Sequence, residues 1–327
     1  MAILTTDFAH VTDDLQEIFK EVSKNAIAES YGMKLFNVKE STRKTYDHLI
    51  IHGLAGVQKV AEGADFPAVT SVEGDFLTWT QSQYAALISI TKQARIFDLY
   101  DVIENQARTI IDDGYDKIDQ SLADVLTNGF SSSNYTDVYG ESVSATGYDG
   151  LALFSASHTN NINSNTFSNL IVSAGVTNPT LSREAIAAGL VQGLKYEDPN
   201  GIMRPIRYDT LLVAPSKEDE ALRAVMSGQM PGSAENDTNM YLKGKLKVEV
   251  WERLETRTGG TDTSAYWFLA DSNKVKETLH AIFAQKPQLD PPDVVYKNKN
   301  WDYSFDYLYS IGRGFSPYLR GSNASLS

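Results

Sequence analysis

Two small groups of side chains have the types and spacing that chemistry needs. Ser155, Ser157 and His158 lie together in one polar segment, and a serine beside a histidine can act as a nucleophile with its base. That chemistry also needs an oxyanion hole and a group that orients the histidine, and no G-x-S-x-G elbow is present. We interpret the segment as a turn held by side-chain hydrogen bonds and keep a Ser/His hydrolase as an alternative.

The second group is a pair of histidines four residues apart, His48 and His52. No glutamate completes an H-E-x-x-H pattern, so a structural role is favoured over a metal site. Three lysines alternate along a predicted strand: Lys243, Lys245 and Lys247. A solvated face is favoured over a phosphate site there, because glutamates follow closely in the sequence. No phosphate-binding loop or dinucleotide fingerprint is present. We therefore expect no catalytic, cofactor-binding or metal-binding residue, no cofactor and no enzyme activity.

Composition narrows the class of protein. The chain has 327 residues, a net charge of −13 and 42% hydrophobic residues, which suits two joined subdomains with real cores. The acidic balance argues against a broad nucleic-acid-binding face. The absence of cysteine excludes disulfides and thiolate sites. No apolar run suits a membrane span and the N-terminus lacks a secretory signal, so we expect a soluble protein that folds in a reducing cytoplasm.

Two long helices should organise the first half of the chain. Residues 13–29 carry an apolar stripe, capped by Thr12, and residues 1–11 precede it as an extended arm. Residues 97–127 keep helical spacing over about 45 Å, with Gly114 inside as a site for a bend or a close contact. The outer face of this second helix is expected to be acidic, with only Arg108 and Lys117 opposing Asp98, Asp101, Glu104, Asp112, Asp113, Asp116, Asp119 and Asp124.

Strands are predicted between and after these helices. Residues 45–92 indicate a long hairpin whose tip lies near 62–74, with strands at 76–80 and 84–91. Residues 130–180 are mostly loop. A mixed α/β region follows from residue 180, with Ser182 or Thr180 capping a helix, a capping box at Ser216, and strands at 210–213, 246–251 and 266–270. Six apolar residues alternate on one face of a final strand: Trp301, Tyr303, Phe305, Tyr307, Tyr309 and Ile311.

Ordering an extended arm and a projecting hairpin costs conformational entropy, and contacts with a partner are needed to offset that cost. A hairpin is also only marginally stable alone. With no active site in view, these features favour an assembling structural protein over an enzyme.

Several ordered segments carry a resemblance to a known family. The runs are Ile88-Ser89-Ile90-Thr91-Lys92, residues 97–103, the helix end at 125–130, residues 208–215 and residues 266–271. Residues 149–160, which read D-G-L-A-L-F-S-A-S-H-T-N, resemble the L-F-S-x-x-H-x-N stretch of Mu-like major head subunits. The ordered set spans about residues 45–320 and resembles the major capsid proteins of tailed bacteriophages.

This resemblance implies an α+β Hong Kong 97-type capsid fold. The implied parts are an N-terminal arm at 1–44, an extended loop at 45–92, a peripheral domain with the spine helix at 93–180, an axial domain at 181–290, and C-terminal strands of the peripheral domain at 291–327. Axial domains of the family meet around hexamer and pentamer axes, and arms and loops lap over neighbouring subunits. A homo-oligomeric icosahedral shell around double-stranded DNA is therefore implied, without sequence-specific DNA binding or membrane contact.

The implied location is the virion capsid, assembled in the host bacterial cytoplasm. The short N-terminal region implies either a separate scaffolding protein or a chain that is already processed, beside a portal, and the need for a decoration protein is left open. An encapsulin-like compartment is the alternative with the same fold. Contacts with neighbouring subunits are expected from Phe8, Leu15, Ile18, Phe19, Val22, Lys59, Glu62, Phe66 and Trp79. A lumen-facing acidic surface is expected from Asp112, Asp113, Asp116 and Asp119. Some members cross-link a lysine to an asparagine, but no motif around Lys59, Asn298 or Asn300 supports this here.

Overall fold

The computed structural model describes residues 6–51, 59–63, 65–66, 73–93, 102–159, 166–198, 201–228, 239–256, 262–291, 293–294, 297, 300–314 and 316–324. The chain divides into two compact units, each with its own sheet. The first comprises Met1–Tyr46, Trp79–Leu122 and His280–Gly312, and the second comprises Asp47–Thr78, Ala123–Leu279 and Arg313–Ser327. None of the described helices combines the length and apolar character needed to cross a bilayer.

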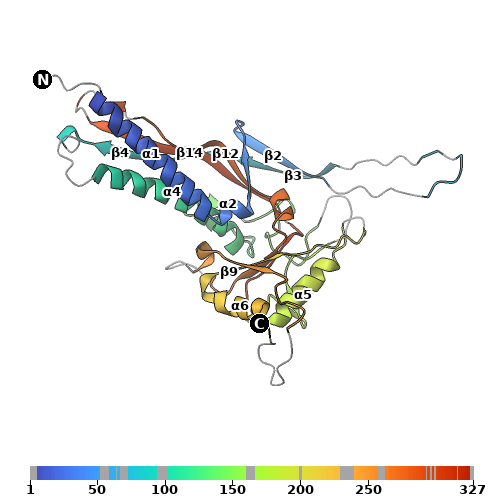
Figure 1. The fold of residues 1–327 in the computed structure, drawn as a ribbon. Coiled ribbons are helices and arrows are strands. Elements are labelled where there is room, and N and C mark those ends of the chain that lie inside the picture. Colours follow the sequence, from blue (N-terminus) through green and yellow to red (C-terminus); the bar gives the residue numbers. More distant parts are fainter. Residues whose placement is uncertain are drawn as a thin grey trace. The chain divides into compact units, whose positions relative to one another are not determined.

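The first unit is built on a five-stranded sheet (Figure 1). Its strands run in the order β1 (Asn37–Glu40), β12 (Leu279–Leu289), β14 (Trp301–Arg313) and β13 (Asp293–Val294), and β4 (Ser82–Ile90) also pairs with β14. β1 is parallel to β12, whereas β4 is antiparallel to β14 with Trp301 opposite Ile90. The sheet therefore joins segments from the start, middle and end of the chain.

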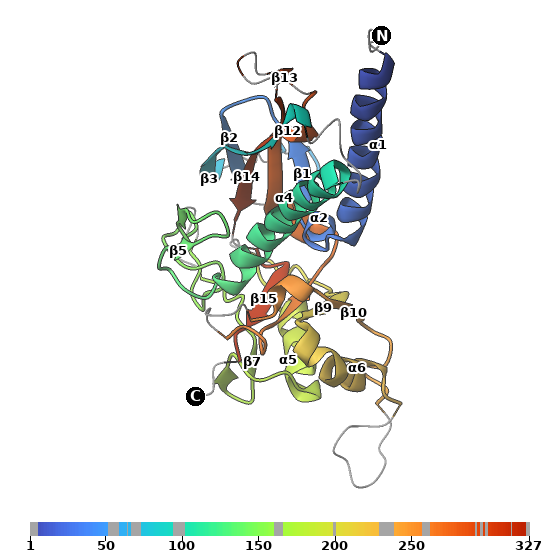
Figure 2. The ribbon, with the colours of Figure 1, turned by 90° about the vertical axis from the view of Figure 1, so that its left-hand side faces the viewer.

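Two helices, α1 (Thr6–Glu29) and α4 (Val102–Thr127), cover one face of this sheet (Figure 2). The alternation of β14 is confirmed through Tyr309, because its aromatic residues from Trp301 onward are buried on that face. Phe305 packs against both helices. The Phe19 ring of α1 lies edge-on to the Phe305 ring, with 6.5 Å between the ring centroids. A Cβ on Gly114 of α4 would lie 2.3 Å from the same ring, which confirms the expected close contact.

Three expectations for this unit need correction. α1 spans Thr6–Glu29 and therefore includes the residues ahead of the expected start at residue 13. Residues 6–11 are therefore helical instead of extended. Ile311 is only half-buried, because the alternation ends where Ser310 and Gly312 are both buried. The expected start of α4 at residue 97 lies outside the described residues.

The hairpin is shorter than predicted. β2 (Thr45–Ile51) and β3 (Glu73–Thr80) form a two-stranded ribbon (Figure 1), and most of the predicted tip lies outside the described residues. The next strand, β4, pairs with β14 along its length and not with the hairpin. Gln81 fixes the change of direction: its backbone N–H donates to the Lys44 carbonyl, and its side chain donates to the carbonyls of Ser41 and Arg43.

The second unit is built on a four-stranded sheet. Its order is β10 (Lys247–Val250), β9 (Thr210–Val213), β11 (Trp267–Ala270) and β15 (Leu319–Ser322). Helices α5 (Arg183–Leu194) and α6 (Glu218–Met226) pack on one face, where Leu211, Val213 and Leu269 join their buried residues in a single core. Phe154 stacks on Phe130 and contacts Phe268 on the other face.

The remaining elements are short. They are α2 (Gly32–Leu35), β5 (Tyr135–Thr136), β6 (Ser142–Val143), β7 (Val172–Ser173), β8 (Val176–Thr177) and three 3₁₀ turns at Pro215–Lys217, Glu252–Leu254 and Lys274–Glu277. Ser182 caps α5, as predicted, by accepting from the Ala185 N–H at 3.1 Å. Ser216 does not form the predicted capping box, because its N–H and hydroxyl both donate to the Glu255 carboxylate.

The pairing of strands exchanges two segments between the predicted domains. β12 was expected in the region 181–290, yet it is central to the sheet of the first unit. β15 was expected among the strands that follow residue 291, yet it pairs with β11 in the second unit. Both pairings join residues far apart in the sequence, and local residue patterns carry no signal for them.

Candidate functional site

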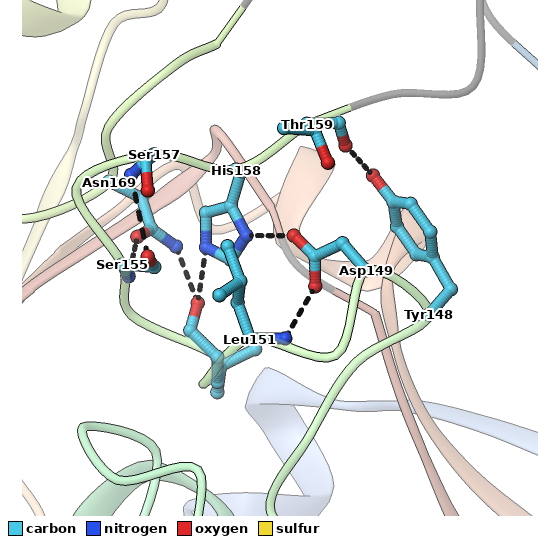
Figure 3. Close-up of polar contacts among 9 residues, drawn as sticks. Tyr148, Asp149, Leu151, Ser155, Ser157, His158, Thr159 and Asn169 are labelled. Carbon is cyan, nitrogen blue, oxygen red and sulfur yellow. Dashed lines mark hydrogen bonds and ion pairs between the residues drawn. The ribbon is translucent and has the colours of Figure 1, made fainter.

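The Ser/His segment folds into a polar loop around the buried side chain of His158 (Figure 3). His158 is fully buried, and its Nδ1 lies 2.7 Å from Oδ2 of Asp149, whose side chain is 1% exposed. Its Nε2 lies 3.2 Å from the Leu153 carbonyl oxygen. A carbonyl oxygen can only accept, so both ring nitrogens lie beside oxygen acceptors that the loop supplies.

The neighbours of His158 hold the loop together through further hydrogen bonds. Asn169 donates to the Leu153 carbonyl at 2.7 Å and accepts from the Ser155 N–H at 2.8 Å. The Ser155 hydroxyl accepts from the Ser157 N–H. Both imidazole nitrogens face acceptors that the loop supplies, so His158 is not placed to take a proton from a serine. The predicted turn held by side-chain hydrogen bonds is confirmed, and the hydrolase alternative gains no support.

The structure offers no metal centre among the described residues. No group of three or more His, Cys, Asp or Glu side chains there is close enough to hold an ion. His48 lies on β2, and His52 falls outside the described residues. The lysines at 243, 245 and 247 are exposed, as predicted. Lys247 pairs with Glu249, and the Lys245 Nζ lies 3.9 Å from the ring centre of Tyr241.

The acidic face of α4 is smaller than predicted. Asp112, Asp113 and Asp116 are exposed. Burial, followed by repulsion from Asp116 and Glu29, raises the pKa of Asp112. The predicted positions of Asp119 and Asp124 on this outer face are wrong, since both side chains are buried.

Asp119 has a different role. Its Oδ1 accepts from the Ser30 hydroxyl at 2.5 Å and from the Gly32 N–H at 2.9 Å. The carboxylate therefore fixes the turn between α1 and α2 to α4. Helical periodicity could have shown this burial, because Asp119 follows the buried Tyr115 by four residues and falls on the same side of the helix.

The residues predicted to contact neighbouring subunits fall into two groups. Leu15, Ile18 and Val22 are buried by their own chain, while Phe19 packs against Phe305 and Trp79 stacks on Tyr46 at 6.2 Å. The exposed group is Lys59, Glu62 and Phe66, of which Phe66 is 90% exposed. The Phe8 side chain lies outside the described residues. The inter-subunit role of both groups stays a prediction.

Sequence reasoning missed a further set of exposed apolar residues in the second unit. Val191 and Leu194 lie on the outer side of α5, and Met226 and Met240 lie at and after the end of α6. One available signal was the near absence of polar residues along α5, whose sequence R-E-A-I-A-A-G-L-V-Q-G-L has apolar positions on every side.

A family described as "Phage capsid protein" matches residues 76–315, well over half of the chain. The chain belongs to the phage capsid protein family. No curated protein matches this phage capsid protein. The match begins within β3 and covers β4, α4, the whole His158 loop and the strands through β14.

Solved capsid structures share its fold. "Capsid of native GTA particle computed with C5 symmetry" aligns with a TM-score of 0.53 at 12% identity, covering 88% of each chain. "Capsid structure of the Cyanophage P-SCSP1u" gives a TM-score of 0.53 at 12% identity, with 90% and 87% covered. "Procapsid of bacteriophage JBD30 computed in I4 symmetry" gives 0.50 at 11% identity, with 99% of this chain and 77% of that chain covered.

The predicted family, the α+β Hong Kong 97-type fold and the virion capsid location are thereby confirmed. The protein is a phage capsid protein. Its family and fold are structural and not enzymatic. The encapsulin-like alternative is less supported than the phage capsid.

Proposed function

We propose that this capsid protein forms hexamers and pentamers that close into an icosahedral shell around a double-stranded DNA genome in the host cytoplasm. The observation that carries the proposal is the β2–β3 ribbon. In the described part of the chain no third strand pairs with it, and Phe76 on β3 is 68% exposed. Such a ribbon is marginally stable in water, so a neighbouring copy is the partner that best supports it. Many weak contacts of this kind make a stable shell.

The partners follow from the same proposal. The chain binds copies of itself, and a separate scaffolding protein and a portal complete the head, with a decoration protein as an optional addition. An encapsulin-like shell would enclose a protein cargo in place of DNA. Nuclease-protected DNA within purified particles would favour the phage head, whereas particles filled with a cargo enzyme would favour the compartment.

Deletion of residues 60–74 tests the role of the ribbon. We expect a subunit with wild-type circular dichroism that forms no shells in negative-stain images. The control is Ser157→Ala, which changes an exposed loop side chain outside the ribbon and should leave shells intact. Normal shells from the deletion variant would refute the docking role of the loop.

The exposed acidic face of α4 has a second proposed role at the lumen. Asp112, Asp113 and Asp116 would repel phosphate and let packaged DNA move. Changing these three residues to asparagine should make DNA retention more sensitive to salt. Asp119 stays unchanged, because it is buried. The matched control neutralises three exposed carboxylates on α6: Glu218, Asp219 and Glu220. Equal salt dependence in both variants would contradict the proposal.

A further inference from the structure

Trp79 attaches the base of the β2–β3 ribbon to the sheet of the first unit. Its indole lies against Gly312 of β14, where an added Cβ would be 2.9 Å from Cζ3 and 3.0 Å from Cε3 of the indole. Tyr46 of β2 stacks on the indole, with 6.2 Å between the ring centroids and 12° between the ring planes. The His280 ring of β12 lies edge-on to it, with 6.1 Å between centroids. All four residues belong to the first unit, so β2, β12 and β14 each place a residue against one side chain of β3.

The close approach requires glycine at position 312. Favourable contacts between carbon atoms are about 3.5–4.0 Å long, so the Cβ of any other residue would overlap the indole. The same Cβ would lie 3.0 Å from the Cβ of His280, which moves only with the backbone of β12. Because Trp79 is only half-buried, its indole is the group that gives way when a side chain is added at Gly312.

Gln81 forms a second attachment, just after the end of β3. This residue is 8% exposed, and its Nε2 donates to the carbonyls of Ser41 at 3.1 Å and Arg43 at 3.2 Å. Its N–H donates to the Lys44 carbonyl at 3.0 Å. The Ser41 N–H donates in turn to the Phe283 carbonyl on β12 at 2.9 Å. The chain is therefore tied to the sheet both where it enters the ribbon and where it leaves.

The attachment is confined to the base of the ribbon. Nζ of Lys39, on β1, donates to the Tyr46 hydroxyl at 3.2 Å and lies 5.6 Å from the centre of its ring. One residue farther out, the Thr78 hydroxyl donates to the Asp47 carboxylate, and both of these residues are exposed. Phe76 follows with 68% of its surface exposed. The own subunit thus holds the base and leaves the next residues accessible.

We infer that Trp79, seated on Gly312, is a positioning residue that holds the base of the ribbon in its docking geometry before a neighbouring copy binds. A ribbon that is ordered only at the moment of contact loses conformational entropy in that step, whereas one already held by its own subunit does not. The inference rests on the proposed docking of the ribbon and names the residues that prepare it. Gln81 supports the same geometry through the segment at 41–44.

Limited trypsin digestion of the unassembled subunit tests whether the attachment exists. The Arg43 and Lys44 side chains are exposed, but the carbonyls of the peptide bonds that trypsin would cut accept hydrogen bonds from Gln81. Cleavage follows the population of the opened segment, so Gln81→Ala should raise its rate there by about tenfold. Trp79→Ala should raise it as well. Gln83→Ala, at an exposed glutamine two residues later, is the matched control. A wild-type cleavage rate in either anchor variant would overturn the inference.

Assembly tests whether the attachment prepares docking. Gly312→Ala displaces the indole and should raise the subunit concentration needed for shell formation by about tenfold. Trp79→Ala removes the ring without adding a clash in the sheet, and the same rise is expected from it. Urea unfolding identifies conditions in which each variant is folded, and assembly is compared there. Shells formed by both variants at the wild-type concentration would overturn the inference.

A double variant separates the positioning role from a general weakening of β14. Phenylalanine at position 79 keeps an aromatic ring but lacks the indole carbons that approach Gly312, so Gly312→Ala with Trp79→Phe should assemble near the wild-type concentration. A double variant no better than Gly312→Ala alone would overturn the role of the indole. Absence of shells from the wild-type chain would instead refute the proposed function, while the digestion still decides whether the attachment exists.

Discussion

The packing of Gly114 against Phe305 yields a quantitative prediction. In a helix interior, Gly→Ala normally stabilises by about 1 kcal/mol, because alanine has the higher helix propensity. At Gly114 the new Cβ would lie 2.3 Å from Cε1 and 2.7 Å from Cζ of the Phe305 ring. Carbon atoms make favourable contacts at about 3.5–4.0 Å, so the ring or the helix must move by about 1 Å.

The ring has little room to move. Phe305 is buried, with the Phe19 ring 6.5 Å away and the Tyr307 ring 5.8 Å away between centroids. Overpacking of a tight core costs about 1–3 kcal/mol, and a confined aromatic ring places this site at the upper end. After the gain in helix propensity, Gly114→Ala should lower the free energy of unfolding by about 2 kcal/mol.

Urea unfolding of the unassembled subunit, followed by circular dichroism, measures this change. Thr109→Ala on the exposed side of the same helix is the control, and it should be within about 0.5 kcal/mol of wild type. A Phe305→Leu background removes the clashing ring atoms, so the cost of Gly114→Ala should largely disappear there. An alanine variant as stable as wild type, or an equal cost in both backgrounds, would refute the reasoning.

Three further predictions concern buried polar groups. His158→Ala leaves the buried Asp149 carboxylate without its partner and should destabilise by about 3 kcal/mol or more in urea unfolding, while Ser157→Ala should be neutral. Asp119→Ala removes the acceptor of Ser30 and Gly32 and should cost about 2–3 kcal/mol in the same assay, whereas exposed Asp113→Ala should change stability by less than about 0.5 kcal/mol. Burial, opposed by Arg320, raises the pKa of Tyr208 to about 12. Its contribution to stability should therefore be complete below the unfolded pKa of about 10 and lost between pH 10 and 12. Tyr208→Phe should reduce the loss of stability seen over that range in unfolding measured against pH, and part of the loss should persist because burial also raises the pKa of Tyr115, Tyr135, Tyr196, Tyr266 and Tyr318.

Local patterns sufficed for much of the fold. The period of two in β14 predicted its buried face, because successive side chains of a strand point to opposite faces. The period of 3.6 predicted α4, because residues three and four apart lie on the same side of a helix. The cap at Ser182 needs only the residues of one turn. The family resemblance rested on ordered short segments, which the match over residues 76–315 bears out.

Contacts between distant segments were beyond such patterns. The sequence of β4 is equally compatible with a strand of the hairpin and with a strand of the larger sheet. Its pairing with β14 shows that it belongs to the sheet. Asp119 looks like one of many surface carboxylates until Ser30 and Gly32 surround its oxygen. The serines beside His158 suggested a nucleophile, yet the decisive partner is Asp149, nine residues earlier.

The sequence by itself determined the period of each helix and strand, the absence of thiol chemistry and the family, since these depend on residue type and near spacing. The tertiary structure alone decided which strand joins which sheet, which carboxylates are buried and which apolar helix faces stay uncovered. The physical reason is that burial is a property of the packed chain: the same Leu or Asp is stable inside or outside according to the partners that distant segments bring to it.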